Sequence, residues 1–199
     1  AAYHRDLWES LDVNVEIWTE KDAIAGIMSQ ETNRWDVPLL AGRGYASHSF
    51  LYNTAEYIKE IGKPACMYYF GDYDPRGLDI SRFVEEHLRE YAEDMDITYA
   101  RVGVTREQID RMELPTRPTK REENGFGRDF DAERVDIDTV DPRTWRAMVR
   151  ACITRHVSHE QLGRLHRIEA EERHLLRDVV TRMAREQGAR AAQRREFPE

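Results

Sequence analysis

Cysteine is scarce in this 199-residue chain, which has only Cys66 and Cys152. The first falls in a predicted buried strand and the second in a predicted helix, so we interpret both as reduced packing residues and not as a disulfide framework. The sequence also lacks a secretory signal and any apolar stretch long enough to span a membrane. These absences predict a cytoplasmic protein that does not act at a membrane.

Several ligand-binding and nucleophile motifs are missing as well. There is no Walker glycine-lysine loop and no dinucleotide glycine fingerprint. Ser47 and His48 are adjacent, but they lack the Gly-x-Ser-x-Gly elbow that exposes a nucleophile. His156 and His159 are three positions apart without a third ligand nearby in the sequence, which argues against a structural zinc site.

An excess of positive charge is also lacking, because 30 Lys and Arg residues face 38 Asp and Glu residues and give a net charge of −8. Affinity for duplex DNA depends largely on neutralising phosphates with Lys and Arg. A general electrostatic DNA clamp is therefore excluded. Any contact with nucleic acid must rely on metal ions, on local basic patches or on a partner surface. The length suits one domain, or one domain with an appendage.

The most informative segment present is Phe70-Gly71-Asp72-Tyr73-Asp74-Pro75-Arg76-Gly77. The apolar run before it, bounded by Pro75 and Gly77, is typical of a buried strand. Asp72 and Asp74 then lie at the carboxyl end of that strand, where open parallel sheets bind ligands. Alternate residues of an extended chain point to one side, and two carboxylates suit Mg²⁺. Asp-x-Asp-Pro is equally ordinary turn chemistry, so both interpretations stay open at this point.

A third carboxylate follows a second predicted strand. Val13, Val15 and Ile17 alternate with polar positions, which indicates a strand, and apolar residues at helical spacing come next. Glu20 therefore lies at a strand-to-helix junction, where it would join Asp72 and Asp74 if the two strands are neighbours. Glu16 falls within the strand, and we interpret it as a solvated or paired side chain.

Three segments in this order resemble the Toprim domain, and most of all that of the topoisomerase VI A subunit and the related meiotic double-strand-break protein. The family pattern reads roughly Val-Glu-Lys, then Gly-x-Gly-Tyr-Pro, then Asp-x-Asp-Pro-x-Gly. The matching segments here are Glu20-Lys21-Asp22-Ala23, Gly42-Arg43-Gly44-Tyr45-Ala46-Ser47 and Gly71-Asp72-Tyr73-Asp74-Pro75-Arg76-Gly77. The resemblance covers about residues 13 to 105.

The resemblance implies that Glu20, Asp72 and Asp74 form an acidic site for Mg²⁺, with Mn²⁺ as the alternative ion. It also implies that Glu20 acts as a general acid/base. The loop that contains Gly42, Gly44 and Tyr45 is expected beside this metal site. We expect nucleic-acid contacts from four basic residues: Lys21, Arg43, Arg76 and Lys120.

The chain departs from the family pattern in two ways. Ala46 and Ser47 replace the family's Pro-Asp, and Arg76 stands where an aromatic residue is usual, so nucleic-acid contacts there cannot be copied from the family. Topoisomerase VI relatives also cut DNA with a tyrosine on a separate winged-helix domain ahead of the Toprim. Only about a dozen residues precede the first predicted strand here.

Alternating strands and helices predict an α/β fold of the Toprim, or Rossmann-like, kind, with a parallel sheet flanked by helices and a C-terminal helical appendage. The predicted strands are 13–19, 37–41, 65–71 and 97–102, and the predicted helices between them are 22–30, 47–61 and 78–93. For Glu20 to meet Asp72 and Asp74, the first and third strands must be neighbours, with the second strand on the other side of the first. The acidic residues would then lie at a topological switch point.

The predicted domain organisation has five parts: a lead-in over 1–12, a Toprim core over 13–112, a polar loop over 113–134, an extension with one strand and two helices over 135–187, and a tail over 188–199 that frays. Thr105 and Ser158 are predicted helix caps. The polar loop contains Lys120 and other basic residues. They either hold a phosphate backbone across the acidic site or form a solvated surface loop, and the second interpretation is slightly favoured because charge runs are usually solvated. The two C-terminal helices pack on each other, form an appendage or make a homodimer contact; periodicity does not distinguish these.

The sequence thus predicts an Mg²⁺-dependent module for phosphoryl transfer on DNA. In the leading version it is a DNA-cleaving module of the topoisomerase VI type, completed by a winged-helix domain upstream or on a partner, with an ATPase as a further partner. The alternatives are a stand-alone Toprim nuclease of the phage-defence type, in which water is the nucleophile, and a non-catalytic module that binds nucleic acid. Whether the chain is an enzyme stays open at this point.

Overall fold

The structure is a computed structural model that describes residues 7–42, 44–118 and 133–196, with side chains described as far as residue 185. The chain forms two compact units. One is Trp8–Val157, and the other combines Ala1–Leu7 with Ser158–Glu199. The first unit contains the sheet and all the residues of the candidate site. In the second unit, the described residues form mainly one long helix, α6 (His159–Glu196).

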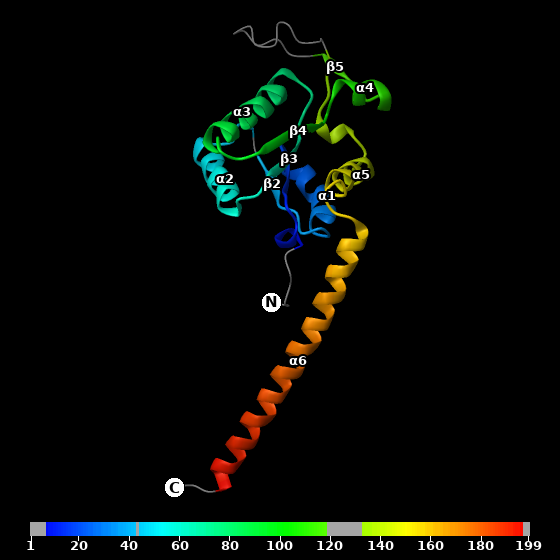
Figure 1. Ribbon diagram of the computed structural model, residues 1–199. Helices are drawn as coiled ribbons and strands as arrows, with labels where there is room; N and C mark the ends of the chain where they lie inside the picture. The colour runs from blue at the N-terminus through cyan, green and yellow to red at the C-terminus, as the bar shows by residue number, and fades with distance from the viewer. Residues whose placement is uncertain (1–6, 43, 119–132, 197–199) are drawn as a thin grey trace. The chain divides into compact units, whose positions relative to one another are not determined.

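Four parallel strands form a single sheet in the order β2-β1-β3-β4 (Figure 1). The strands are β1 (Asn14–Thr19), β2 (Leu39–Ala41), β3 (Ala65–Phe70) and β4 (Ile97–Gly103). Strand β1 lies between β2 and β3, which confirms the predicted strand order and the α/β class. The arrangement is Rossmann-like. The chain passes from β1 to β2 on one side and then to β3 on the other side of β1, so the topological switch point lies at β1.

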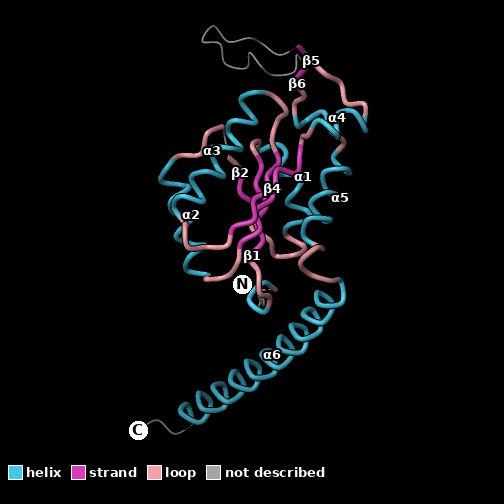
Figure 2. The backbone as a smooth tube through the Cα atoms, turned by 45° about the horizontal axis from the view of Figure 1, so that its top comes forward, coloured by secondary structure: helices cyan, strands magenta, loops and turns pink. Residues whose placement is uncertain are grey.

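Helices cover both faces of the sheet (Figures 1 and 2). One face is covered by α2 (His48–Ile61) and α3 (Pro75–Tyr91), and the other by α1 (Asp22–Thr32) and α5 (Pro142–Ile153). The remaining elements are η1 (Trp8–Ser10), α4 (Arg106–Met112), η2 (Ile137–Thr139) and a small antiparallel pair, β5 (Arg117–Pro118) with β6 (Glu133–Arg134). The two-sided coverage explains why the central strands are buried on both faces.

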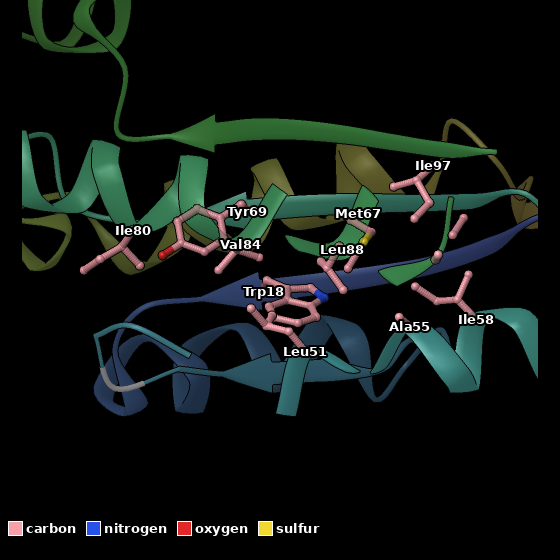
Figure 3. Close-up of a cluster of buried hydrophobic side chains, with 12 residues drawn as sticks. Trp18, Leu51, Ala55, Ile58, Met67, Tyr69, Ile80, Val84, Leu88 and Ile97 are labelled. Atoms are coloured by element: carbon pink, nitrogen blue, oxygen red, sulfur yellow. The ribbon is translucent and has the colours of Figure 1, made fainter. Parts of the chain in front are cut away.

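The alternation of side chains along β1 and β3 divides the core into two layers. Trp18, Met67 and Tyr69 face α2 and α3 and belong to one buried cluster, part of which Figure 3 shows. On the other side of β3, Phe70 packs edge-on against Trp145 of α5, with ring centroids 5.5 Å apart. Because each strand contributes to both layers, its position is fixed by packing on two sides.

The two C-terminal helices belong to different compact units. Helix α5 packs against α1, and an ion pair joins Arg150 to Glu31. Trp145 is fully buried, so α5 completes the core of the sheet unit, while α6 belongs to the other unit. Helix α6 also continues to Glu196, past the position where the predicted tail begins.

The strand expected near residue 135 is short. The predicted strand near residue 135 is limited to β6 and to a bridge between Val135 and Tyr73, after which the chain turns into η2. The predicted cap at Thr105 is confirmed, with a reciprocal pair of bonds to Gln108. Within the described residues, no helix has the length and apolar character needed to cross a membrane.

Candidate functional site

The carboxyl ends of β1 and β3 meet at one edge of the sheet. Thr19 lies opposite Phe70 in the parallel register, and the backbone N–H of Glu20 donates to the Phe70 carbonyl oxygen at 3.0 Å. Glu20, the first residue after β1, therefore lies directly beside Gly71, the first residue after β3. The predicted meeting of Glu20 with the Asp72 segment is confirmed. We call Glu20, Asp72 and Asp74 the acidic edge.

The turn after β3 depends on two glycines at points of close approach. A Cβ on Gly71 would lie 2.7 Å from Oε2 of Glu20, and a Cβ on Gly77 would lie 2.5 Å from the carbonyl oxygen of Asp72. Both separations are shorter than real Cβ contacts. At Gly77 the obstacle is backbone, so the turn requires glycine there, whereas a side chain at Gly71 would displace the carboxylate of Glu20. Pro75 stands in the first turn of α3, where its missing N–H costs nothing.

The three carboxylates each accept a bond from the protein through one oxygen. Oε2 of Glu20 accepts from the backbone N–H of Asp72 at 3.2 Å, and Oδ1 of Asp72 accepts from the backbone N–H of Ile137 at 2.7 Å. Oδ1 of Asp74 accepts from the N–H of Gly77 at 2.7 Å and so caps α3. Among the described residues no hydrogen bond reaches the second oxygen of Glu20, Asp72 or Asp74. Asp74 thus fulfils the turn role, and within the described part of the chain each of the three side chains keeps one oxygen without a hydrogen bond.

Burial and mutual repulsion determine the electrostatics of the acidic edge. Burial raises the pKa of Glu20, and the nearby charges of Asp72 and Asp74 raise it further. Burial also raises the pKa of Asp72, although the Ile137 N–H and Lys21 oppose that shift. The like charges therefore remain only partly compensated, and a cation placed among the free oxygens would be strongly favoured.

Lys21 supplies one counter-charge. Its Nζ lies 3.1 Å from Oδ1 of Asp72 and 2.6 Å from Oδ1 of Asp138, which lies in η2. Burial lowers the pKa of Lys21, but the hydrogen bonds to Asp138 and Asp72 outweigh it, so that the net shift is upward and the ammonium stays charged. Lys21 was expected to contact nucleic acid, and in the structure its ammonium is paired with Asp72 and Asp138.

Arg101 supplies a second counter-charge that the sequence analysis missed. Its guanidinium donates to the backbone carbonyls of Gly71, Asp72 and Gly77, and so ties both ends of the turn to β4. Burial lowers the pKa of Arg101, but an arginine stays protonated in proteins. The only sequence signal was one basic residue near the end of an otherwise largely apolar strand. Asp138 and Ile137 were missed as well, because they reach the site from a distant segment.

The glycine loop after β2 lies where it was expected. The N–H of Gly42 donates to the carbonyl oxygen of Thr19 at 2.8 Å, which holds the loop against the end of β1. Gly44 adopts a φ of +77°, a conformation that favours glycine. Arg76 is exposed in the first turn of α3, and its Nη2 would lie 4.0 Å from a Cβ on Gly44. Arg43 and Lys120, the other predicted nucleic-acid contacts, lie outside the described residues.

The donor chemistry of the acidic edge suits Mg²⁺ or Mn²⁺, since three carboxylates each offer a free oxygen. Across residues 7–42, 44–118 and 133–196, however, no group of three or more His, Cys, Asp or Glu side chains is already gathered around a metal position. Lys21 also occupies space beside Asp72. Metal binding at this edge therefore requires side-chain rotation that brings the free oxygens together.

No protein-family model matches this chain, and a search of the curated proteins found no significant match. The resemblance to the Toprim family rests on the three sequence segments quoted above.

Proposed function

We propose that the acidic edge binds Mg²⁺, or Mn²⁺ in its place, and performs phosphoryl-transfer chemistry on DNA. The observation that supports this most is the convergence of Glu20, Asp72 and Asp74 where the strand order changes direction. A bound divalent ion would neutralise charge on a scissile phosphate and stabilise an attacking or leaving oxygen. Three carboxylates whose repulsion is only partly compensated favour such an ion.

The protein groups have separate roles in this proposal. Glu20 holds or moves a proton, because burial and the neighbouring carboxylates raise its pKa toward the range useful for general acid/base catalysis. Arg76, which is exposed beside the glycine loop, contacts the phosphate backbone. Lys21 moves from Asp72 to a phosphate oxygen when a metal ion takes its place as the counter-charge.

The attacking group comes from outside the described residues. The Tyr45 hydroxyl is bonded to Asp79. Tyr99 is partly buried, and the desolvation of its hydroxyl raises its pKa and keeps it a phenol. In the proposal a tyrosine on a winged-helix domain, in a longer chain or on a partner, attacks the phosphate, as the resemblance to topoisomerase VI implies. A second version uses water, as in Toprim nucleases, and is favoured by the raised pKa of Glu20, which suits a residue that activates water.

The direct test measures thermal stability with and without Mg²⁺. Metal should raise the melting temperature of the wild-type chain, since a ligand at 100 times its Kd adds about 2.7 kcal/mol. The double variant Asp72→Asn, Asp74→Asn should lose this gain, while the control Asp110→Asn, on the exposed surface of α4, should keep it. Equal stabilisation of the wild type and the double variant would refute the metal site.

A cleavage assay separates the two versions. Tyrosine attack joins protein covalently to a DNA end, whereas water attack releases free ends. This chain alone, with Mg²⁺, should place no DNA in the protein band of a denaturing gel. If it releases free ends and Glu20→Gln abolishes that release, while Glu56→Gln on α2 does not, the nuclease version holds. An adduct that disappears with Tyr45→Phe would overturn the assignment of the nucleophile to another domain.

A further inference from the structure

A groove lies between β2 and α2, away from the acidic edge. It encloses about 410 Å³ and is lined by Glu16, Pro38, Leu39, Leu40, Phe50, Asn53, Thr54 and Tyr57. This volume is within the range of cavities that hold small molecules. We call it the β2–α2 groove. Five of these residues are apolar or aromatic, Asn53 and Thr54 are neutral and polar, and Glu16 carries the only carboxyl group of the lining.

Glu16 is the unusual residue of this groove. It comes from the middle of β1 and is 1% exposed. The amide of Asn14 donates to Oε1 at 3.2 Å, and the indole N–H of Trp18 donates to Oε2 at 2.9 Å. No cation contacts this carboxylate among the described residues. A buried carboxylate held only by neutral donors is costly when ionised, and a cationic ligand in the groove would compensate that cost.

Aromatic side chains form the outer part of the groove. Phe50 is 38% exposed and Tyr57 is 48% exposed, although both are large apolar residues. Phe50 is held edge-on against Trp18, with centroids 5.6 Å apart. Exposed ring faces attract organic cations through the ring quadrupole, and most strongly where water is excluded. The groove thus combines a buried carboxyl group with aromatic surface at its mouth.

We propose that the β2–α2 groove binds a small organic cation whose charge is surrounded by apolar groups, an alkylammonium of the choline type. A purely apolar ligand would leave Glu16 uncompensated. A compact, strongly hydrated inorganic cation would gain nothing from Phe50, Tyr57 and Leu40. The net charge of −8 adds a favourable long-range field for any cation. The site is independent of the acidic edge, because none of the three edge carboxylates lines the groove.

The test compares choline with 3,3-dimethylbutan-1-ol, which has the same shape without the charge. The indole N–H of Trp18 is the reporter in two-dimensional NMR, since it bonds to Glu16 directly. Choline should shift this signal saturably, and the alcohol should bind at least tenfold more weakly. Equal binding of the two compounds, or no saturable shift with choline, would overturn the proposal.

Two substitutions on the same helix provide a matched pair. Tyr57→Leu should lower the affinity for choline at least fivefold, because it removes an aromatic side chain from the lining of the groove. Tyr52→Leu should leave choline binding unchanged, because Tyr52 is also exposed on α2 but contacts Tyr91 and does not line the groove. Glu16→Gln should lower the affinity for choline to the affinity for the alcohol. If this variant does not fold, the comparison of Tyr57→Leu with Tyr52→Leu still tests the proposal. Equal effects of the two tyrosine substitutions would contradict the site.

Discussion

Glu16 and Glu20 lie in the middle and just past the end of the same strand, yet their surroundings differ in kind. Burial raises the pKa of both carboxyls. The neutral donors Asn14 and Trp18 enclose Glu16, whereas Glu20 meets a backbone N–H and the charges of Asp72 and Asp74. Burial alone therefore does not distinguish the proposed catalytic carboxylate, Glu20, from Glu16. The neighbouring charges of Asp72 and Asp74 distinguish the surroundings of Glu20 from those of Glu16.

The largest expected effect concerns the tight turn that holds the acidic edge together. Gly77→Ala would place a Cβ 2.5 Å from the Asp72 carbonyl oxygen. Overpacking of this kind should lower the free energy of unfolding by about 2–3 kcal/mol. The control is Gly26→Ala in α1, where no atom lies within 4 Å, and which should stabilise the helix by about 0.5–1 kcal/mol. Denaturant unfolding measures both, and destabilisation of equal size would contradict the close approach.

A second prediction tests the enclosed carboxylate of Glu16 through pH. Its pKa in the folded chain is raised above the ordinary value of 4.5, so its stabilising contribution is complete below pH 4.5 and is lost as the pH rises through the raised value. Glu16→Gln cannot lose a proton, so the variant should gain stability relative to the wild type over that window. The gain should approach about 1.4 kcal/mol for each unit by which the pKa is raised. Unfolding curves at several pH values give the difference, and a pH-independent difference would show that Glu16 is not destabilised when ionised.

A third prediction separates the two roles of Asp74. Asp74→Ala removes the cap of α3 and should cost about 1 kcal/mol, whereas Asp74→Asn keeps a capping oxygen and should cost only a few tenths. Both should weaken the stabilisation by Mg²⁺. Thermal melts with and without metal show whether the two effects separate as expected. If Asp74→Asn is as stable as the wild type and also keeps the full metal effect, Asp74 is a cap and nothing more.

The smallest effect is expected at Lys21, whose ammonium competes with a metal ion for Asp72. Lys21→Gln should tighten the binding of Mg²⁺ by roughly two- to fivefold, the equivalent of about 0.5–1 kcal/mol for a partly exposed ion pair. Titration calorimetry measures the change in Kd. Weaker metal binding in the variant would mean that Lys21 organises the site and does not compete with the ion.

The sequence predicts the sheet and the position of the acidic edge because both follow from local patterns. Apolar runs, breakers and caps locate the strands, and the need for Glu20 to meet Asp72 gives the strand order that the structure has. Glu16 was expected to be solvated or paired. Among the described residues it is instead buried and hydrogen-bonded only to the neutral side chains of Asn14 and Trp18.

The contacts that could not be predicted from the sequence are those between distant positions. Asp72 accepts from Ile137, 65 positions away, and no local pattern indicates that partner. Arg101 is an isolated basic residue whose bonds go to backbone carbonyls, which carry no sequence signature. The apolar stripe of α5 predicts a buried face but not that it packs on α1, so the two C-terminal helices were placed together.

The pairing of α1 with α5 has a consequence for the order in which the chain folds. The α2 and α3 layer is built from segments that follow one another between β2 and β4, whereas Arg150 must find Glu31 across 119 positions. Closing so long a loop slows folding more than it reduces final stability, since each doubling of loop length costs only about 0.6 kcal/mol. We therefore expect the α2 and α3 layer to assemble before the layer that contains α5, and Phe70 gains its edge-on partner only once the chain has been made as far as Trp145.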